Sequence, residues 1–299
     1  MSLHRDQKIL VFGKSGQVAQ ALSTLSIGAR AIFLSKDEVN FESPSQIQNV
    51  LDQHSPTHII NCSAYTAVDQ AEVEQDKARL LNATAPGVIA QWCAAHQAQL
   101  IHYSTDYVFD GAGEQFWKET DRPNPLNWYG QTKYEGELAI QNSGCAHIIL
   151  RISWVYSYVG TNFVKTMLRL GSQKEELSVI NDQVGYPTSA LDVARATEKI
   201  LEVNSQRQSP FRGIYHLSGE PKTTWFEFAS EIFRQAREMG YPLTVKNIRP
   251  IQTSEYPTRA RRPLNSRLDS HKIHSDFGIE LPDWKVSLHN CLRKIHQLT

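Results

Sequence analysis

A tyrosine and a lysine stand four positions apart at Tyr129 and Lys133, the only Y-x-x-x-K in the chain. Residues four apart on a helix lie on the same face, so the phenol and the ammonium can share one site. A tyrosine of unperturbed pKa, about 10, is a poor proton shuttle near neutral pH, but a nearby lysine cation stabilises the phenolate. The pair is therefore a candidate for acid catalysis. The alternative is a surface pair of an aromatic ring and a cation.

Two hydroxyl groups and a carboxyl group, those of Ser104, Thr105 and Asp106, follow an apolar run at residues 100–103. The run predicts a buried strand, and open α/β sheets hold their ligands beyond the carboxyl ends of their strands. A hydroxyl group at that place, together with Tyr129 and Lys133, completes a set that is typical of hydride-transferring enzymes, in which the phenol supplies the proton.

A glycine-containing segment, G-x-x-G-x-x-A, follows the first apolar run and precedes a helix-like stretch. Gly13 permits a tight turn out of the strand, and Gly16 has no Cβ, so a pyrophosphate can approach the backbone at the helix N-terminus. Ala19 is small enough for the helix to pack closely on the strand. The segment favours dinucleotide binding over an ordinary turn between a strand and a helix, which is the alternative.

The second predicted strand ends at Ser35 and Lys36, where enzymes specific for NAD carry an acidic residue that binds the ribose hydroxyls. No acid stands at this position. We therefore expect nothing here to repel a 2′-phosphate, which makes NADPH as acceptable as NADH. The alternative is that Lys36 is an ordinary surface lysine.

Apolar runs that alternate with helix-like segments must position these groups. They predict a parallel sheet that is covered on both faces. We interpret the chain as α/β, with a Rossmann-type doubly wound sheet in residues 1–160 and a smaller substrate-binding lobe in residues 161–299, between which the chain can cross back. The predicted strands of the first part cover residues 9–12, 32–34, 58–62, 100–103 and 148–152.

The second part is predicted to be helical at residues 162–170, 189–201 and 284–296, with strands at 177–180 and 214–217 and a loop at 249–265. Two sequences have the form of a capping box, in which the first side chain and the one three residues later bond each other's backbone N–H. One begins at Ser43 and the other at Thr224.

Composition excludes several classes of protein. The chain has 299 residues with 31 basic and 31 acidic side chains, so no basic excess favours nucleic acid. No apolar run reaches the roughly 18 residues of a membrane span, and no signal peptide is visible. Four cysteines without paired spacing are typical of a reducing cytoplasm, where we expect the protein. The eleven histidines form no recognised metal motif, so no metal is expected.

Several long strings in a fixed order resemble the extended short-chain dehydrogenase/reductases, and more narrowly the dTDP-4-dehydrorhamnose reductase family. The resemblance runs from residue 8 to about residue 284. The strings that carry it are residues 12–18 (FGKSGQV), 61–69 (NCSAYTAVD), 102–109 (HYSTDYVF), 124–130 (NPLNWYG), 151–156 (RISWVY), 177–183 (LSVINDQ) and 256–259 (YPTR).

The resemblance implies roles for matching positions. Tyr129 would be the catalytic acid, Lys133 its partner on the nicotinamide ribose, and Thr105 would bond the reacting sugar oxygen. The other implied cofactor positions are Gly13, Gly16, Gln17 and Val18 at the pyrophosphate, Ser35, Asn40 and Phe41 around the adenosine, and Ala64, Tyr65, Thr66 and Tyr103 beside the nicotinamide. The implied substrate positions are Thr105, Asp106, Trp154, Asn162 and Arg262. The chain departs from the family pattern at Ala19 and Ser35, and the second departure bears on cofactor preference.

Four arginines, at 259, 261, 262 and 267, fall within nine residues. Guanidinium groups bind phosphate oxygens in pairs of hydrogen bonds, so a nucleotide diphosphate is a natural partner. We expect one or two of these arginines to act in this way, Arg262 first. A solvated basic loop is the alternative.

The implied activity is reduction by NADPH or NADH of the C4 keto group of dTDP-4-dehydrorhamnose, giving dTDP-L-rhamnose for cell-envelope polysaccharide. Two alternatives remain open at this point. One is a regulatory subunit resembling that of methionine adenosyltransferase, and the other is a different nucleotide-sugar reductase or epimerase. The expected partner is the dTDP-sugar, with a homodimer left open.

Overall fold

The computed structural model describes residues 7–298. Its centre is a six-stranded sheet in the order β10-β5-β4-β3-β1-β2, and all pairs are parallel. This order confirms the predicted Rossmann-type α/β sheet. The strands are β1 (Ile9–Phe12), β2 (Ala31–Leu34), β3 (His58–Asn61), β4 (Gln99–Thr105), β5 (Ala146–Ile152) and β10 (Gly213–Leu217).

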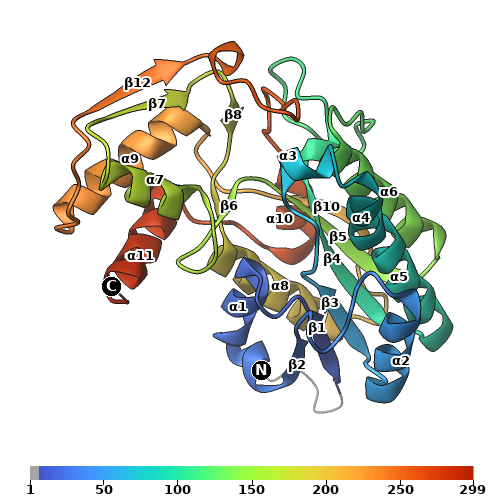
Figure 1. The fold of residues 1–299 in the computed structure, drawn as a ribbon. Coiled ribbons are helices and arrows are strands. Elements are labelled where there is room, and N and C mark those ends of the chain that lie inside the picture. Colours follow the sequence, from blue (N-terminus) through green and yellow to red (C-terminus); the bar gives the residue numbers. More distant parts are fainter. Residues whose placement is uncertain (1–6, 299) are drawn as a thin grey trace.

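Helices cover both faces of the sheet (Figure 1). Ile9 and Val11 of β1 face a core shared with helices α1 (Gln17–Ser23), α8 (Ala190–Ser205) and α10 (His271–Phe277). Leu10 and Phe12 face a second core with α2 (Pro44–His54), α5 (Ala85–His96) and α6 (Trp128–Asn142). The apolar run of β1 is therefore continuous because both faces of this strand are buried, whereas Ile32 of the edge strand β2 is exposed.

The second half of the chain contributes to this sheet. Strand β10 pairs with β5, α8 packs on α1, and α10 packs on β10. Two stretches after residue 161, α8 with β10 and α10, thus belong to the large sheet and alternate along the chain with the segments of the smaller lobe.

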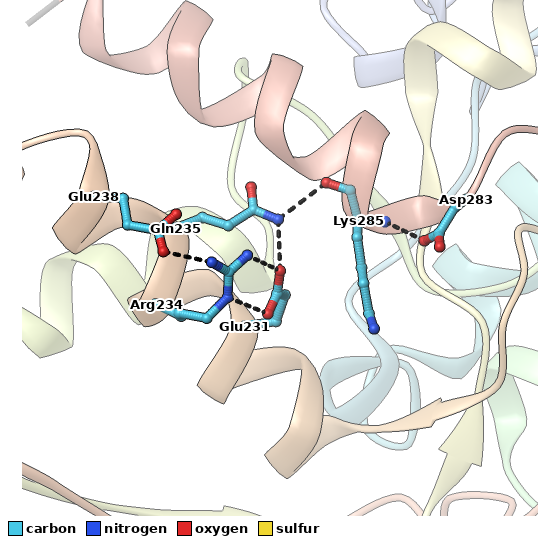
Figure 2. A network of polar contacts seen from close by, with 6 residues as sticks. All are labelled: Glu231, Arg234, Gln235, Glu238, Asp283 and Lys285. Carbon is cyan, nitrogen blue, oxygen red and sulfur yellow. Dashed lines mark hydrogen bonds and ion pairs between the residues drawn. The ribbon is translucent and has the colours of Figure 1, made fainter.

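The smaller lobe has a core of its own. It is built on α7 (Phe163–Gly171), α9 (Trp225–Glu238) and α11 (Trp284–His296), with β7 (Glu176–Ile180) paired in parallel to β12 (Asn247–Ile251). Figure 2 shows the polar edge of this packing, where Gln235 Nε2 of α9 donates to the Lys285 carbonyl of α11 at 3.0 Å. Asp283 caps α11 by accepting from the Lys285 N–H at 2.8 Å.

The other elements are short. They are α3 (Val68–Ala71), α4 (Gln75–Arg79), β6 (Val155–Tyr156), β8 (Val184–Gly185), β9 (Thr188–Ser189) and β11 (Thr223–Thr224), with η1 (Ser26–Ala29), η2 (Leu80–Thr84), η3 (Asp106–Val108) and η4 (Thr253–Glu255). Among residues 7–298, no helix has the length and apolar character needed to cross a bilayer.

Two local predictions need correction, and one is confirmed. The capping box at Thr224 is present. The Ser43 side chain makes no capping bond, since its hydroxyl lies 3.2 Å from that of Ser45, and the Gln46 amide oxygen accepts from the Asn40 N–H at 3.2 Å. The predicted loop at 249–265 begins inside a strand, since β12 runs to Ile251 and borders β7 alone, where Pro250 is tolerated.

Candidate active site

The proposed acid is placed by the start of α6. Asn127 caps this helix by accepting from the Gly130 N–H at 2.8 Å. Gly130 is required because a Cβ there would stand 2.1 Å from the Tyr107 carbonyl oxygen. The close approach brings Tyr129 to the carboxyl end of β4, where its phenol hydrogen-bonds Thr105. The phenol and one of the two predicted hydroxyl groups therefore meet.

Burial raises the pKa of Tyr129 to about 12, while the Thr105 hydrogen bond lowers it and the Asp106 carboxylate raises it. The sequence analysis expects Lys133 to stabilise the phenolate. Lys133 instead donates to the Tyr103 carbonyl at 2.7 Å and lies 3.1 Å from His102 Nε2. In this structure, the group that stabilises the phenolate is Thr105.

Lys133 is 1% exposed. Burial lowers the pKa of its ammonium to about 8, and the negative charge of Glu137 acts in the opposite direction. Glu137 is itself neutralised by Arg151, whose guanidinium donates to it at 2.9 and 2.6 Å. Ser104, the other predicted hydroxyl, donates to Glu137 at 2.5 Å and so belongs to this buried ion pair.

Asp106 is buried beside the phenol. Its Oδ1 accepts from the Thr105 hydroxyl at 3.1 Å, whereas Oδ2 has no hydrogen-bond partner among the described residues. Burial raises the pKa of the carboxyl group to about 6, despite hydrogen bonds from Ser266 and Thr105. A buried acceptor without a partner is costly, and Oδ2 is shielded from solvent in this structure.

A cavity of about 420 Å³ opens in front of the glycine segment. Gly13 has φ +86°, and a Cβ there would meet the backbone of Cys62 and Ser63 at 2.9 Å. A Cβ on Gly16 would lie 3.1 Å from the Gly13 carbonyl oxygen and would narrow the cavity floor. Both glycines therefore keep the floor open and close to the backbone.

The cavity brings together part of the predicted cofactor set. Lining residues that the sequence analysis names are Gly13, Gly16, Ser35, Asn40, Phe41 and Ala64. Those that it misses are Ser15, Val39, Glu42, Cys62, Ser63, Lys77 and Leu81.

The other predicted cofactor residues make internal contacts. Gln17 accepts from Asn162 at 2.9 Å, Val18 packs in the core, and the Tyr65 phenol donates to Glu74 at 3.1 Å. Tyr103 bonds Thr197 at 2.7 Å. Thr66 follows Tyr65 on the segment between β3 and α3 and is exposed.

The turn after β2 places Glu38 beside Ser35, although Glu38 is not among the residues that line the cavity. Glu38 accepts from the backbone N–H of Ser35 at 2.8 Å, and this bond lowers the pKa of its carboxyl group. Lys36 does line the cavity.

An aromatic cluster lies on the substrate side. Trp154, at φ +47°, stacks on Trp225 with ring centroids 3.6 Å apart. Trp225 is a residue that the sequence analysis did not select, and its indole N–H donates to Gln183 at 3.1 Å. Asn162 caps α7 and bonds Gln17, so its amide links the smaller lobe to the glycine segment.

Arg262 is engaged by an acid. Its Nη2 and Nη1 donate to the two carboxylate oxygens of Asp69 at 2.6 and 3.2 Å. Asp69 also accepts from the Ala260 N–H at 3.0 Å and so ties the arginine loop to α3. Of the other arginines, Arg267 donates to Asn265 at 2.8 Å, and Arg259 and Arg261 are exposed.

Known proteins match this chain over nearly its whole length. The family model described as the RmlD substrate binding domain matches residues 7–297. The dTDP-4-dehydrorhamnose reductase of Escherichia coli (strain K12) is 43% identical over an alignment of 296 residues, and the match covers 97% of this chain and 99% of that protein.

Solved structures also resemble this chain over nearly its whole length. The dTDP-4-dehydrorhamnose reductase of Bacillus anthracis str. Ames, in complex with NADP, superposes with a TM-score of 0.89 at 33% identity and covers 96% of this chain and 99% of that one. The UDP-glucose 4-epimerase of Thermus thermophilus, in complex with NAD, has a TM-score of 0.80 at 16% identity over 98% and 100% of the two chains, which is a likeness of fold alone. The chain belongs to the dTDP-4-dehydrorhamnose reductase family.

Proposed function

We propose that this protein reduces the C4 keto group of dTDP-4-dehydrorhamnose, with NADPH or NADH as the hydride donor and Tyr129 as the proton donor. The observation that carries the proposal is the hydrogen bond between Tyr129 and Thr105 at the end of β4, beside the buried acceptor of Asp106. Family membership supports the substrate, and the relative from Bacillus anthracis contains NADP.

The residues present fit a dinucleotide. The open floor at Gly13 and Gly16 admits a pyrophosphate close to the backbone, and Asn40 and Phe41 line the part of the cavity next to Ser35. When bound, the nicotinamide supplies a hydride. The residues of this chain have the remaining task of placing a carbonyl group near Tyr129 and protonating its oxygen.

Each group near the phenol has a distinct part in that task. Thr105 hydrogen-bonds the Tyr129 phenol and holds the reacting oxygen within its reach. Asp106 Oδ2 accepts a hydroxyl of the sugar, which satisfies its missing hydrogen bond. Trp154 offers a ring face to the sugar at the junction of the two lobes. Arg262 binds the diphosphate once Asp69 releases it.

The test is turnover of dTDP-4-dehydrorhamnose, followed by oxidation of NADPH or NADH. Tyr129→Phe keeps the ring and removes the acid, so kcat should fall about 10²–10⁴-fold, the usual contribution of a general acid. The matched control is Tyr134→Phe on the same helix, whose ring packs against a small apolar cluster. A Tyr129→Phe variant that keeps more than half of the turnover would remove Tyr129 from the mechanism.

A further inference from the structure

A buried imidazole stands behind Lys133. His102 on β4 is 0% exposed, and each of its ring nitrogens faces one polar side chain. Nε2 lies 3.1 Å from Lys133 Nζ, and Nδ1 lies 3.1 Å from Nδ2 of Asn61 at the end of β3. None of the roles proposed for Tyr129, Thr105 and Asp106 involves His102.

Proton counting assigns the tautomer of His102. The Asn61 amide is oriented by its Oδ1, which accepts from the Ser63 N–H at 3.1 Å. Its NH₂ group must therefore donate to Nδ1 of His102. A neutral imidazole has one N–H and one lone pair, so the proton is on Nε2 and points at Lys133. Burial lowers the pKa of His102 well below its usual range, which disfavours a second proton on the ring.

The Nε2–H group needs an acceptor, and the only acceptor that Lys133 can offer is the lone pair of its neutral amine. An ammonium would set N–H against N–H across 3.1 Å. The Tyr103 carbonyl accepts from Lys133 at 2.7 Å in either protonation state. Asn61 and His102 therefore favour the form of Lys133 that has already lost its proton.

Other charged and titratable groups on and around α6 have partners of their own. Within α6, Glu137 raises the pKa of Lys133 but is paired with Arg151 of β5. The remaining pairs are Tyr129 with Thr105, Asp106 of η3 with Thr105, Arg79 of α4 with Glu135 of α6, and Asp69 of α3 with Arg262. Of the groups that contact Lys133 directly, His102 is the one whose hydrogen-bonding role depends on the protonation of the lysine.

We infer that His102, oriented by Asn61, is a positioning residue that stabilises neutral Lys133 and so makes this lysine the group that returns a proton to Tyr129. The inference rests on the proposed function. After Tyr129 has given its proton to the new sugar oxygen, one N–H bond of the Lys133 ammonium breaks. The proton crosses one helical turn to the phenolate through a bridging hydroxyl group or water. The lone pair left on Nζ accepts the Nε2–H, which remains on His102, and solvent water later reprotonates the amine.

The first test observes the tautomer directly, by ¹⁵N NMR of the imidazole rings in the full chain without cofactor. His102 should be neutral with its proton on Nε2. Asn61→Asp replaces the donor by an acceptor of the same shape, so the proton should move to Nδ1. His216 is an internal control, because its Nδ1 lies 2.9 Å from the Trp117 carbonyl and must carry the proton in both proteins. A proton on Nδ1 of His102 in the wild type would overturn the inference.

The second test is the pH dependence of kcat. In Asn61→Asp, His102 Nε2 accepts from the ammonium, so the pKa of Lys133 should rise. Because the step needs protonated lysine, activity is lost as pH rises through that pKa. The alkaline limb should therefore move up by about one pH unit, a tenfold gain in relative activity above the limb. His102→Gln also offers the ammonium an oxygen and should move the limb in the same direction, which covers the case in which Asn61→Asp does not fold.

An unmoved limb in a folded variant would overturn the inference. Failure of the proposed function is a separate result, because it appears as retained turnover in Tyr129→Phe and leaves the tautomer of His102 unchanged.

Discussion

Replacing Asp69 by asparagine should release the arginine that we propose for the diphosphate. In the structure the Asp69 carboxylate accepts two hydrogen bonds from Arg262 and one from the Ala260 N–H. Asparagine keeps one oxygen for Ala260 but loses the charge, and its NH₂ group cannot accept from a guanidinium. The loop stays anchored while Arg262 becomes free to bind an anion.

The magnitude follows from exposure and geometry. The Asp69 side chain is 43% exposed and that of Arg262 is 21% exposed, so solvent screens the ion pair. Exposed pairs contribute about 0.2–1 kcal/mol, and the bidentate geometry places this one near the upper value. A diphosphate that displaces Asp69 must overcome about 1 kcal/mol, which is about fivefold in affinity. Asp69→Asn should therefore lower the KM for the sugar nucleotide up to about fivefold and leave kcat unchanged, because the diphosphate is remote from the reacting carbon.

The assay is steady-state turnover at saturating cofactor, with Arg262→Ala measured beside it. Arg262→Ala should raise KM. The control is Glu135→Gln, which breaks a similar bidentate pair with Arg79 and should leave KM unchanged. A KM that rises in Asp69→Asn would show that the pair holds the loop in its binding conformation and that the diphosphate does not compete with Asp69.

Three further predictions concern the cofactor, the lysine and the buried acid. Lys133→Met should lower kcat and also weaken cofactor binding, and an unchanged cofactor Kd by titration would mean that the lysine does not touch the ribose. Ser35→Asp adds a second carboxylate beside Glu38 and should shift the kcat/KM ratio toward NADH, up to about fivefold for a partly exposed charge. Asp106→Asn should lower turnover yet stabilise the fold by about 1–3 kcal/mol in urea unfolding at pH 8. Burial raises the pKa of Asp106 in the folded state, so its ionisation costs stability as pH rises from about 4 to about 6, and a less stable variant at pH 8 would contradict this reasoning.

The fold could be predicted because its signals are local. A run such as Ile9–Phe12 is apolar at every position, and only a strand buried on both faces makes use of all four side chains. The wrong predictions also rested on local sequence, but the structure at those positions depends on contacts with other residues. Ser43 has the right residue type for a cap, yet its hydroxyl lies against that of Ser45 and its N–H donates to the Asn40 carbonyl. Strand β12 exists because β7 offers an unpaired edge, which no property of its own proline-containing sequence indicates.

The site was predictable where a residue type limits the chemistry. Tyr129 and Thr105 were selected for their groups, and the sheet brings them together because one begins α6 and the other ends β4. Pairings across the chain were not predictable. Asp69 and Arg262 are 193 positions apart, and neither segment has a sequence feature that predicts contact with the other. The role of a buried histidine such as His102 can be assigned only when the partners of both ring nitrogens are known, which the sequence does not provide.

Burial raises the pKa of Tyr129 at the carboxyl end of β4 to about 12, but it brings the pKa values of two neighbouring groups toward neutrality from opposite sides. The pKa of Asp106 rises from 3.8 to about 6, and that of Lys133 falls from 10.5 to about 8, with burial the largest cause in both. A surface acid and a surface lysine would keep their charges over this range and could not exchange protons easily. Burying these ionisable groups is unfavourable, and the packing of the two apolar cores of the sheet, which hold β4 and α6 in place, offsets this free energy. The same packing that makes this edge unfavourable for charge therefore makes it suited to proton transfer.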